Sequence, residues 1–222
     1  MGKLIVFEGL DGSGKRTHSR IVTEKLNNMG KPSKNITFPN YDEPSSSLVK
    51  MYLSGEFGNE PDSVPAYAAS AFYAVDRFAS FKKFWENDYN NGKIIIADRY
   101  VTSNIIHQMV KLNENEWDGY IDWLEDFEYN KMKLPRPDKV FYLDMPPEVS
   151  QSLILKRYRN DESKKDIHEK DFEYLLKCKK TAEYAAKKLG WQTIALCRNK
   201  AELASKEENN GMIFNELLKE LF

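Results

Sequence analysis

A glycine-rich run near the start of this sequence has the residue types and spacing of a phosphate-binding loop. It lies between a short apolar run, residues 4–7, and a segment of helical periodicity that begins near Lys15. The glycines allow backbone conformations that turn N–H groups toward an anion, and the N-terminus of the helix adds partial positive charge. A lysine at the end of such a loop reaches the outer phosphates of a nucleotide. We therefore expect the phosphates of ATP to bind at Gly9, Leu10, Asp11, Gly12, Ser13, Gly14, Lys15, Arg16 and Thr17.

One position departs from the usual pattern of such loops. The residue after the lysine is normally Ser or Thr, whose hydroxyl ligates the Mg²⁺ carried by ATP, but here it is Arg16. Thr17 follows it on the helix and is rotated by about 100° from that position. Two interpretations stay open. Arg16 points to solvent while a carboxylate such as Asp98 holds the metal through water, or Arg16 contacts the phosphates of ATP.

The elements that must position this loop are visible as apolar runs. Residues 4–7, 94–97 and 140–143 are continuous apolar runs rich in β-branched and aromatic residues, and residues 35–38 and 192–196 are weaker candidates. Continuous rather than alternating hydrophobicity is typical of strands buried on both faces, which predicts a parallel sheet with helices on each side. The alternation of strands and helical segments predicts one α/β doubly wound domain over residues 1–222, with five strands.

Composition excludes several classes of protein. Hydrophobic residues make up 41% and charged residues 30%, with a net charge of -1. We therefore expect no nucleic acid and no anionic membrane as partner. No apolar run approaches the roughly 20 residues that span a bilayer. Two cysteines, Cys178 and Cys197, build no disulfide framework, so we expect a cytoplasmic protein.

A charged stretch, residues 161–171, stands before the last long helical segment. A solvated loop and a mobile lid are both open interpretations of its composition. If it is a lid, it covers about residues 157–170.

Six motifs in order resemble those of the thymidylate kinase family over roughly residues 3–189. They are residues 7–15, Phe38 with Pro39, residues 73–77, residues 98–100, Ser103 with His107 and Gln108, and Leu143 with Asp144. The resemblance implies a P-loop NTPase-type five-stranded parallel sheet with a short mobile lid, and a homodimer. It also implies transfer of the γ-phosphoryl group of ATP, with Mg²⁺, to dTMP, giving dTDP.

The resemblance also assigns roles around the transferred group. Arg99 is expected to contact the acceptor phosphate and the phosphoryl group in flight, and its planar fork suits bidentate phosphate contact. Asp98 is expected to hold Arg99 or metal-bound water, and Asp11 to lie near the acceptor's 3′-hydroxyl and phosphate. The acceptor phosphate is already ionised near neutral pH, so the reaction needs no general base.

The base and sugar contacts follow from the same resemblance. Tyr73 and Arg77 lie one helical turn apart, for stacking on thymine and for bonding a base carbonyl. Phe38 is expected to pack beside the sugar or base, and Pro39 to fix the turn after its strand. The remaining expected dTMP contacts are a hydrogen bond from Ser103, bulk near the sugar 2′ carbon from His107, and an amide edge from Gln108.

Two arginines found in some thymidylate kinases are absent, at Gly12 and just after Pro39. Members without the loop arginine supply the cation from the lid, and the candidates here are Arg157, Arg159, Lys164 and Lys165. Arg157 and Arg159 lie two residues apart and on a helix face different ways. We therefore expect Arg157 and a lid lysine, Lys165, to act together with Asp11, Lys15 and Arg99 in catalysis.

Other functions stay open at this point. A kinase for dUMP, UMP or CMP differs only in the pocket around Tyr73, Arg77, His107 and Gln108. A deoxynucleoside kinase needs a free carboxylate as base, and none is obvious. Arg16 favours a third interpretation, a catalytically weak ATP-binding protein, because it replaces the usual Ser or Thr metal ligand.

Replacing both Lys164 and Lys165 by Ala tests the lid interpretation. A cation over the transferring group contributes on the order of 10³-fold in related reactions, so turnover should fall far more than ATP affinity. Steady-state kinetics and an ATP-binding measurement separate the two effects. Unchanged turnover would show that this stretch is only a solvated loop.

Overall fold

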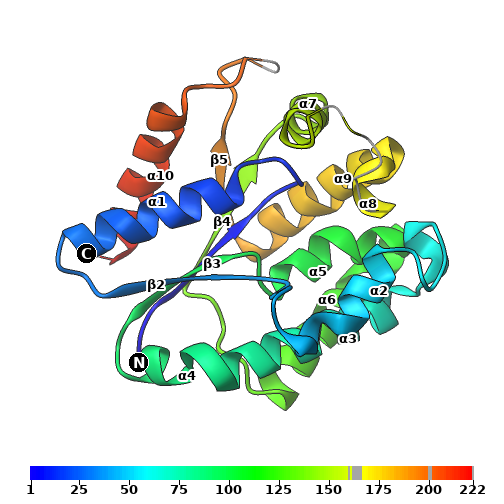
Figure 1. Cartoon of the computed structure of the whole chain (residues 1–222), viewed down its shortest axis with the longest axis horizontal. Coiled ribbons are helices and arrows are strands. Elements are labelled where there is room, and N and C mark those ends of the chain that lie inside the picture. Colours follow the sequence, from blue (N-terminus) through cyan, green and yellow to red (C-terminus); the bar gives the residue numbers. More distant parts are fainter. Residues whose placement is uncertain (160, 162–166, 200–201, 222) are drawn as a thin grey trace.

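The computed structural model of the chain has a central parallel sheet with helices on both faces (Figure 1). The structure describes residues 1–159, 161, 167–199 and 202–221. The sheet has five strands in the spatial order β2-β3-β1-β4-β5, and every neighbouring pair is parallel. The strands are β1 (Leu4–Glu8), β2 (Ser33–Thr37), β3 (Ile94–Asp98), β4 (Lys139–Asp144) and β5 (Gln192–Ala195). This confirms the predicted α/β class and the five-stranded parallel sheet.

The helices alternate with the strands along the chain. They are α1 (Lys15–Asn28), α2 (Ser47–Leu53), α3 (Ala66–Ser80), α4 (Glu86–Asn90), α5 (Thr102–His107), α6 (Trp117–Glu125), α7 (Pro147–Arg157), α8 (Ile167–Lys170), α9 (Phe172–Leu189) and α10 (Lys206–Leu221). A π-helical turn, Phe81–Trp85, joins α3 to α4, and a second, Asp126–Lys131, follows α6. Within the described ranges, no helix has the length and apolar character needed to cross a membrane.

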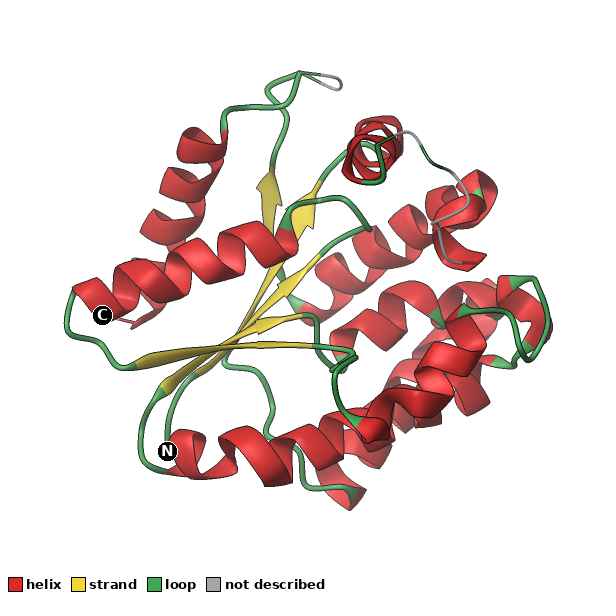
Figure 2. Ribbon diagram, viewed as in Figure 1, coloured by secondary structure: helices red, strands yellow, loops and turns green. Residues whose placement is uncertain are grey.

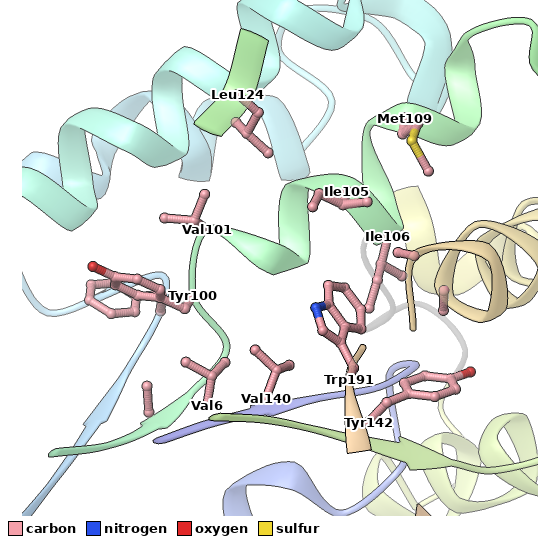
Figure 3. Packing of buried hydrophobic residues seen from close by; sticks show 14 of the residues in the cluster. Val6, Tyr100, Val101, Ile105, Ile106, Met109, Leu124, Val140, Tyr142 and Trp191 are labelled. Carbon is pink, nitrogen blue, oxygen red and sulfur yellow. The ribbon is translucent and has the colours of Figure 1, made fainter. Parts of the chain in front are cut away.

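Alternate residues of β1 face two different helical layers, because successive side chains of a strand point to opposite faces. Ile5 and Phe7 pack in a core shared with residues of α1 and α10. Leu4 and Val6 pack in a second core shared with residues of α5, α6 and α9. Figure 2 shows the sheet lying between these layers. Figure 3 shows Val6 on the side of the sheet where helical residues of the second core gather.

The parallel register brings several chemically important residues to one edge of the sheet. Phe7 pairs with Asp98, and Asp98 pairs with Thr37, so β1, β2 and β3 end side by side. The backbone N–H of Arg99 donates to the carbonyl oxygen of Phe7 at 3.1 Å. Open α/β sheets bind ligands at the carboxyl ends of their strands. The phosphate loop after β1 and Arg99 after β3 therefore start from adjacent positions.

The core that contains Ile5 and Phe7 allows a prediction about stability. Phe141 of β4 is fully buried, and its ring centroid lies 5.6 Å from that of Phe7. Phe141→Ala should lower the free energy of unfolding by about 3–5 kcal/mol, since it leaves a cavity in the core that the sheet shares with α1 and α10. Urea denaturation measures this loss.

The control for Phe141→Ala is Met212→Ala on the half-exposed outer side of α10. A surface substitution of this kind should change the free energy of unfolding by no more than about 0.5 kcal/mol. Equal losses in the two variants would contradict the assignment of Phe141 to a tightly packed core.

Candidate functional site

A cavity of about 640 Å³ opens at the carboxyl ends of the strands. Sixteen of the residues expected at the site line it: Asp11, Gly12, Gly14, Lys15, Arg16, Thr17, Phe38, Pro39, Tyr73, Arg77, Asp98, Arg99, Ser103, His107, Gln108 and Arg157. Gly9, Leu10 and Ser13 are not among the lining residues that the structure describes. Lys164 and Lys165 lie outside the described residues. The structure thus brings residues from distant parts of the sequence together around one space.

The phosphate loop depends on two glycines that no larger residue can replace. Gly12 has φ +82°, and a Cβ there would lie 2.6 Å from the carbonyl oxygen of Ser150. Gly9 has φ +151°, and a Cβ there would lie 2.7 Å from the carbonyl oxygen of Leu143. Positive φ is accessible to glycine at little cost. The loop therefore passes close to β4 and α7, with α1 beginning directly after it.

Lys15 is the buried cation of this loop. Its ammonium donates to the carbonyl oxygens of Gly9 at 2.9 Å and of Leu10 at 2.8 Å. Burial, together with the positive charge of Arg99, lowers the pKa of Lys15 to about 8. The next two residues, Arg16 and Thr17, are exposed and both line the cavity.

Arg99 connects three segments of the site. It follows β3 with φ +70°, which is uncommon for a residue other than glycine and costs about 1–3 kcal/mol. Its guanidinium forms an ion pair with Asp11 of the phosphate loop. The same guanidinium donates to Nε2 of His107 at 3.0 Å and, at 3.4 Å, to Oγ of Ser103. Strained backbone of this kind is typical of functional sites.

The charges around Arg99 reinforce one another. Burial opposes ionisation of Asp11, but the positive charges of Arg99 and Lys15 outweigh it and lower the pKa of that carboxyl. Burial also opposes the charge of Arg99, and the carboxylates of Asp11 and Glu8 nevertheless raise the pKa of its guanidinium. The pair therefore stays ionised over the physiological pH range.

Glu8 is a site residue to which sequence analysis assigned no role. It is fully buried and accepts hydrogen bonds from the hydroxyls of Thr102 and Ser103, both at 2.7 Å, and from the backbone N–H of Tyr100 at 3.1 Å. A buried carboxylate needs such donors. The hydroxyl of Ser103 donates to Glu8 in this structure, and its contact with a base stays a prediction. The signal in the sequence was a carboxylate inside a buried strand.

His107 is a buried, neutral imidazole that supports Arg99. Because a guanidinium only donates, Nε2 of His107 accepts from it, and the ring proton lies on Nδ1, 3.6 Å from the sulfur of Cys178. Burial, together with Arg99, lowers the pKa of His107 well below its ordinary value. The ring also lies parallel to that of His168, with centroids 6.2 Å apart. The side chain of His107 is thus tightly packed in the wall of the cavity.

The far end of the cavity has the character of a base pocket. Tyr73 lines it, Phe38 packs against Tyr100 with ring centroids 5.9 Å apart, and the Phe38–Pro39 peptide bond is cis. Gln108 is fully buried, and neither atom of its amide has a hydrogen-bond partner among the described residues. An unpaired buried amide is costly, so this group is available to a polar ligand.

Arg77 lies deeper than expected for a ligand contact. Its guanidinium is bound by Glu128, which sequence analysis missed, and it still lines the cavity. Asp76 was missed as well. It accepts from the backbone N–H of Asn40 at 2.8 Å and from the hydroxyl of Ser45 at 2.6 Å. These contacts fix the segment that follows Pro39.

Residues of α7 and α8 line another part of the cavity. Arg157, at the end of α7, lines the cavity and donates to Oε1 of Glu169 at 2.6 Å, whereas Arg159 is not among the described lining residues. His168 and Glu169 of α8 also line the cavity. His168 forms a 2.8 Å hydrogen bond with the hydroxyl of Tyr52. The role of Arg157 as the catalytic cation stays a prediction.

Asp98 fits the way proteins hold Mg²⁺ in nucleotide sites. It is buried, lines the cavity, and accepts from the hydroxyl of Thr37 at 3.3 Å. Mg²⁺ keeps several waters and uses one or two carboxylates together with substrate phosphates. No cluster of three or more His, Cys, Asp or Glu side chains with metal-ligand geometry occurs in the described part of the chain. The position of Asp98 therefore fits a nucleotide-borne ion.

Comparisons with known proteins agree with this geometry. The family model described as thymidylate kinase matches residues 7–208. The chain is 29% identical over 172 residues to the thymidylate kinase of Mycobacterium tuberculosis, covering 77% of this chain and 79% of that protein. It is 33% identical over 156 residues to that of Brachyspira hyodysenteriae, covering 70% of each. It is also 33% identical over 170 residues to the probable thymidylate kinase of Methanococcus maripaludis, covering 77% of this chain and 71% of that protein.

The fold is also similar to a solved structure. The thymidylate kinase of Candida albicans superposes with a TM-score of 0.71 and 23% identity, covering 99% of this chain and 93% of that chain. At this level of identity, the likeness supports the fold.

The pH dependence of stability tests the buried state of His168. Burial, together with the charge of Lys111, lowers the pKa of His168 to about 3. In the unfolded chain His168 binds a proton below about pH 6.5, whereas in the folded protein it stays neutral down to about pH 3. Its contribution to the free energy of unfolding is therefore fully present above about pH 6.5 and is lost as the pH falls toward about 3. This histidine alone should contribute a slope of about 1.4 kcal/mol per pH unit between pH 6 and 4.

His168→Gln removes this contribution. The free energy of unfolding of the variant, measured by urea denaturation, should therefore fall less steeply over the same pH range. Parallel profiles for wild type and variant would show that His168 is protonated in the folded protein.

Proposed function

The chain belongs to the thymidylate kinase family, and we propose how its cavity transfers the γ-phosphoryl group of ATP to dTMP, forming dTDP. Its relatives carry the name thymidylate kinase, and they favour neither a kinase for other nucleotides nor a non-catalytic ATP-binding protein. The observation that carries the mechanism is the position of Arg99, which stands next to the phosphate loop and faces the same cavity as the base pocket.

Catalysis in this proposal is positioning and charge neutralisation. Phosphoryl transfer needs the two phosphates in line and cations on the transferring oxygens. Lys15 and the backbone N–H groups of the loop bind the outer phosphates of ATP, and Arg99 binds the phosphate of dTMP. Asp11 holds Arg99 in place through their ion pair.

The carboxylates near Arg99 support an acceptor that is already a phosphate. Asp11 is engaged by Arg99, and Glu8 accepts hydrogen bonds from two hydroxyls and one backbone N–H. A kinase for a nucleoside must take a proton from a hydroxyl and keeps a carboxylate for that purpose. Neither of these two carboxylates is placed as such a base.

The base pocket supports a thymine ring. Tyr73 offers an aromatic face for stacking, and Arg77 offers N–H donors to a base carbonyl. Gln108 offers both an amide donor and an acceptor, and neither is used within the described protein. Phe38 and Pro39 close the pocket at the end of β2, and His107 lies on the wall that we assign to the sugar.

The donor side rests on family membership and on the loop. Members of the family use ATP as the phosphate donor, generally with Mg²⁺. We assign Asp98 to hold the ion through water, with Thr17 and Arg16 beside the phosphates. A bound Mg²⁺ would supply positive charge that offsets the charge of the transferring phosphates. Arg157 stands at the lid side of the same cavity, where its guanidinium neutralises charge on the transferring group.

A homodimer is part of the proposal. Tyr67, Val75 and Phe78 leave 42%, 50% and 39% of their surface exposed along α3. Their spacing of eight and three residues puts them on one side of the helix. Exposed apolar side chains at helical spacing support contact with a second copy of the chain. The single-domain and cytoplasmic assignments stay predictions.

A steady-state assay with ATP and Mg²⁺ against dTMP, dUMP, UMP, CMP and thymidine tests the proposed function. We expect rapid ADP release with dTMP, slower release with dUMP and none with thymidine, because thymidine lacks the phosphate that Arg99 binds. The reaction with dTMP also tests whether Arg16 permits metal-assisted transfer. Measurable ATP binding without turnover on any acceptor would overturn the proposal.

A further inference from the structure

A buried ion pair lies behind the base pocket. Nε of Arg77 donates to one carboxylate oxygen of Glu128 at 2.7 Å, and Nη2 donates to the other. The side chains of Arg77 and Glu128 are 1% and 0% exposed. Arg77 lines the cavity, whereas Glu128 does not occur among the lining residues that the structure describes. Glu128 therefore reaches a ligand only through other residues.

The position of Glu128 is one where the helical pattern calls for an apolar residue. It lies in the π-helical turn after α6 and continues the buried side of that helix, four residues after Leu124 and seven after Ile121. Replacing a buried ion pair by well-packed apolar side chains is often neutral or stabilising in proteins. Stability alone is therefore a weak reason for a carboxylate here, and its effect on its neighbours is the more informative feature.

Glu128 fixes the orientation of two groups on the cavity wall. Besides Arg77, it accepts a hydrogen bond from Nδ2 of Asn104 at 3.3 Å, and the same nitrogen donates to the carbonyl oxygen of Ser70 at 3.4 Å. Both partners of this nitrogen are acceptors only, so the amide of Asn104 cannot be flipped. Its oxygen is turned away from Glu128, and Asn104 lines the cavity.

The fork of Arg77 is held in the same way. A guanidinium has five N–H groups, and Glu128 takes the one on Nε and one on Nη2, while Nη1 donates to the carbonyl oxygen of Tyr100 at 3.4 Å. The remaining N–H groups keep a fixed direction. Arg77 and Asn104 both line the cavity, so Glu128 restrains the direction of the remaining N–H groups of Arg77 and of the amide oxygen of Asn104.

A fixed donor on Arg77 beside a fixed acceptor on Asn104 suits one class of pyrimidine. Thymine and uracil carry an acceptor at position 4 and a donor at N3, whereas cytosine carries a donor at position 4 and an acceptor at N3. A site whose polar groups are fixed rejects a ligand that leaves them unpaired. We propose that Glu128 is a positioning residue that makes the pocket select 4-oxo pyrimidine monophosphates over 4-amino ones, an inference that rests on the proposed function.

Glu128→Gln tests this role because it keeps the size of the side chain and changes its hydrogen bonding. The new NH2 group replaces one of the two acceptor oxygens, and in either orientation it faces an N–H of Arg77, so the guanidinium must turn or lose a hydrogen bond. The measurements are kcat and KM for dTMP and for dCMP, KM for ATP, and the melting temperature. We expect the ratio of kcat/KM for dTMP to that for dCMP to fall roughly 10- to 100-fold, with KM for ATP unchanged.

The matched control is Glu125→Gln, one turn earlier. Glu125 pairs with Arg136 at the protein surface at 2.8 Å and is not a described lining residue. In Glu125→Gln the ratio of kcat/KM for dTMP to that for dCMP should equal the wild-type ratio. A purely structural role of Glu128 would lower the melting temperature, or reduce activity on both acceptors equally, and leave the ratio unchanged.

The outcomes separate this inference from the function on which it rests. An active wild type with an unchanged ratio in Glu128→Gln overturns the inference alone. A wild type without dTMP turnover overturns the proposed function and this inference with it. If Glu128→Gln does not fold, Glu128→Asp keeps the charge and shifts the carboxylate by one methylene. In that variant a folded protein with a wild-type ratio overturns the inference, and a lowered ratio supports it.

Discussion

The ion pair between Arg99 and Asp11 is the contact on which the arrangement of the cavity depends. It joins the end of β3 to the phosphate loop after β1, and the same guanidinium reaches His107 of α5. The left-handed backbone of Arg99 is unfavourable by itself. The ion pair offsets that strain, and so does the hydrogen bond from the backbone N–H of Arg99 to the carbonyl oxygen of Phe7 in the adjacent strand. Glu8 then ties the segment after Arg99 to β1.

Much of this arrangement could be predicted because the relevant signals are local. The apolar runs that became β1, β3 and β4 are continuous, and the glycine pattern of the loop depends on a few adjacent positions. The ordered motifs then placed Tyr73 and Arg99 at the cavity. The strands and the loop needed only sequence spacing, whereas Tyr73 and Arg99 were placed by the resemblance to the family, together with the rule that ligands bind at the carboxyl ends of parallel strands.

The residues that were missed act through partners far away in the sequence. Glu8 binds residues more than 90 positions later, and Glu128 binds Arg77 from 51 positions away. Nothing in the spacing of one segment reveals such a pair, although a carboxylate within an apolar pattern does signal that a partner exists. The environment of His107 was partly hidden for the same reason, since Cys178 of α9, which contributes to it, lies 71 positions away.

The two-sided character of β1 has a consequence for how such a protein can change over generations. The residues that we assign to the acceptor, from Tyr73 of α3 to Gln108 after α5, come from one side of the sheet, while Ile5 and Phe7 pack with α1 and α10 on the other. Substitutions in the first layer can alter which acceptor is used without disturbing the packing that supports the start of α1. The phosphate loop can therefore be kept while the residues assigned to the acceptor change. Strand β1 contributes side chains to both cores.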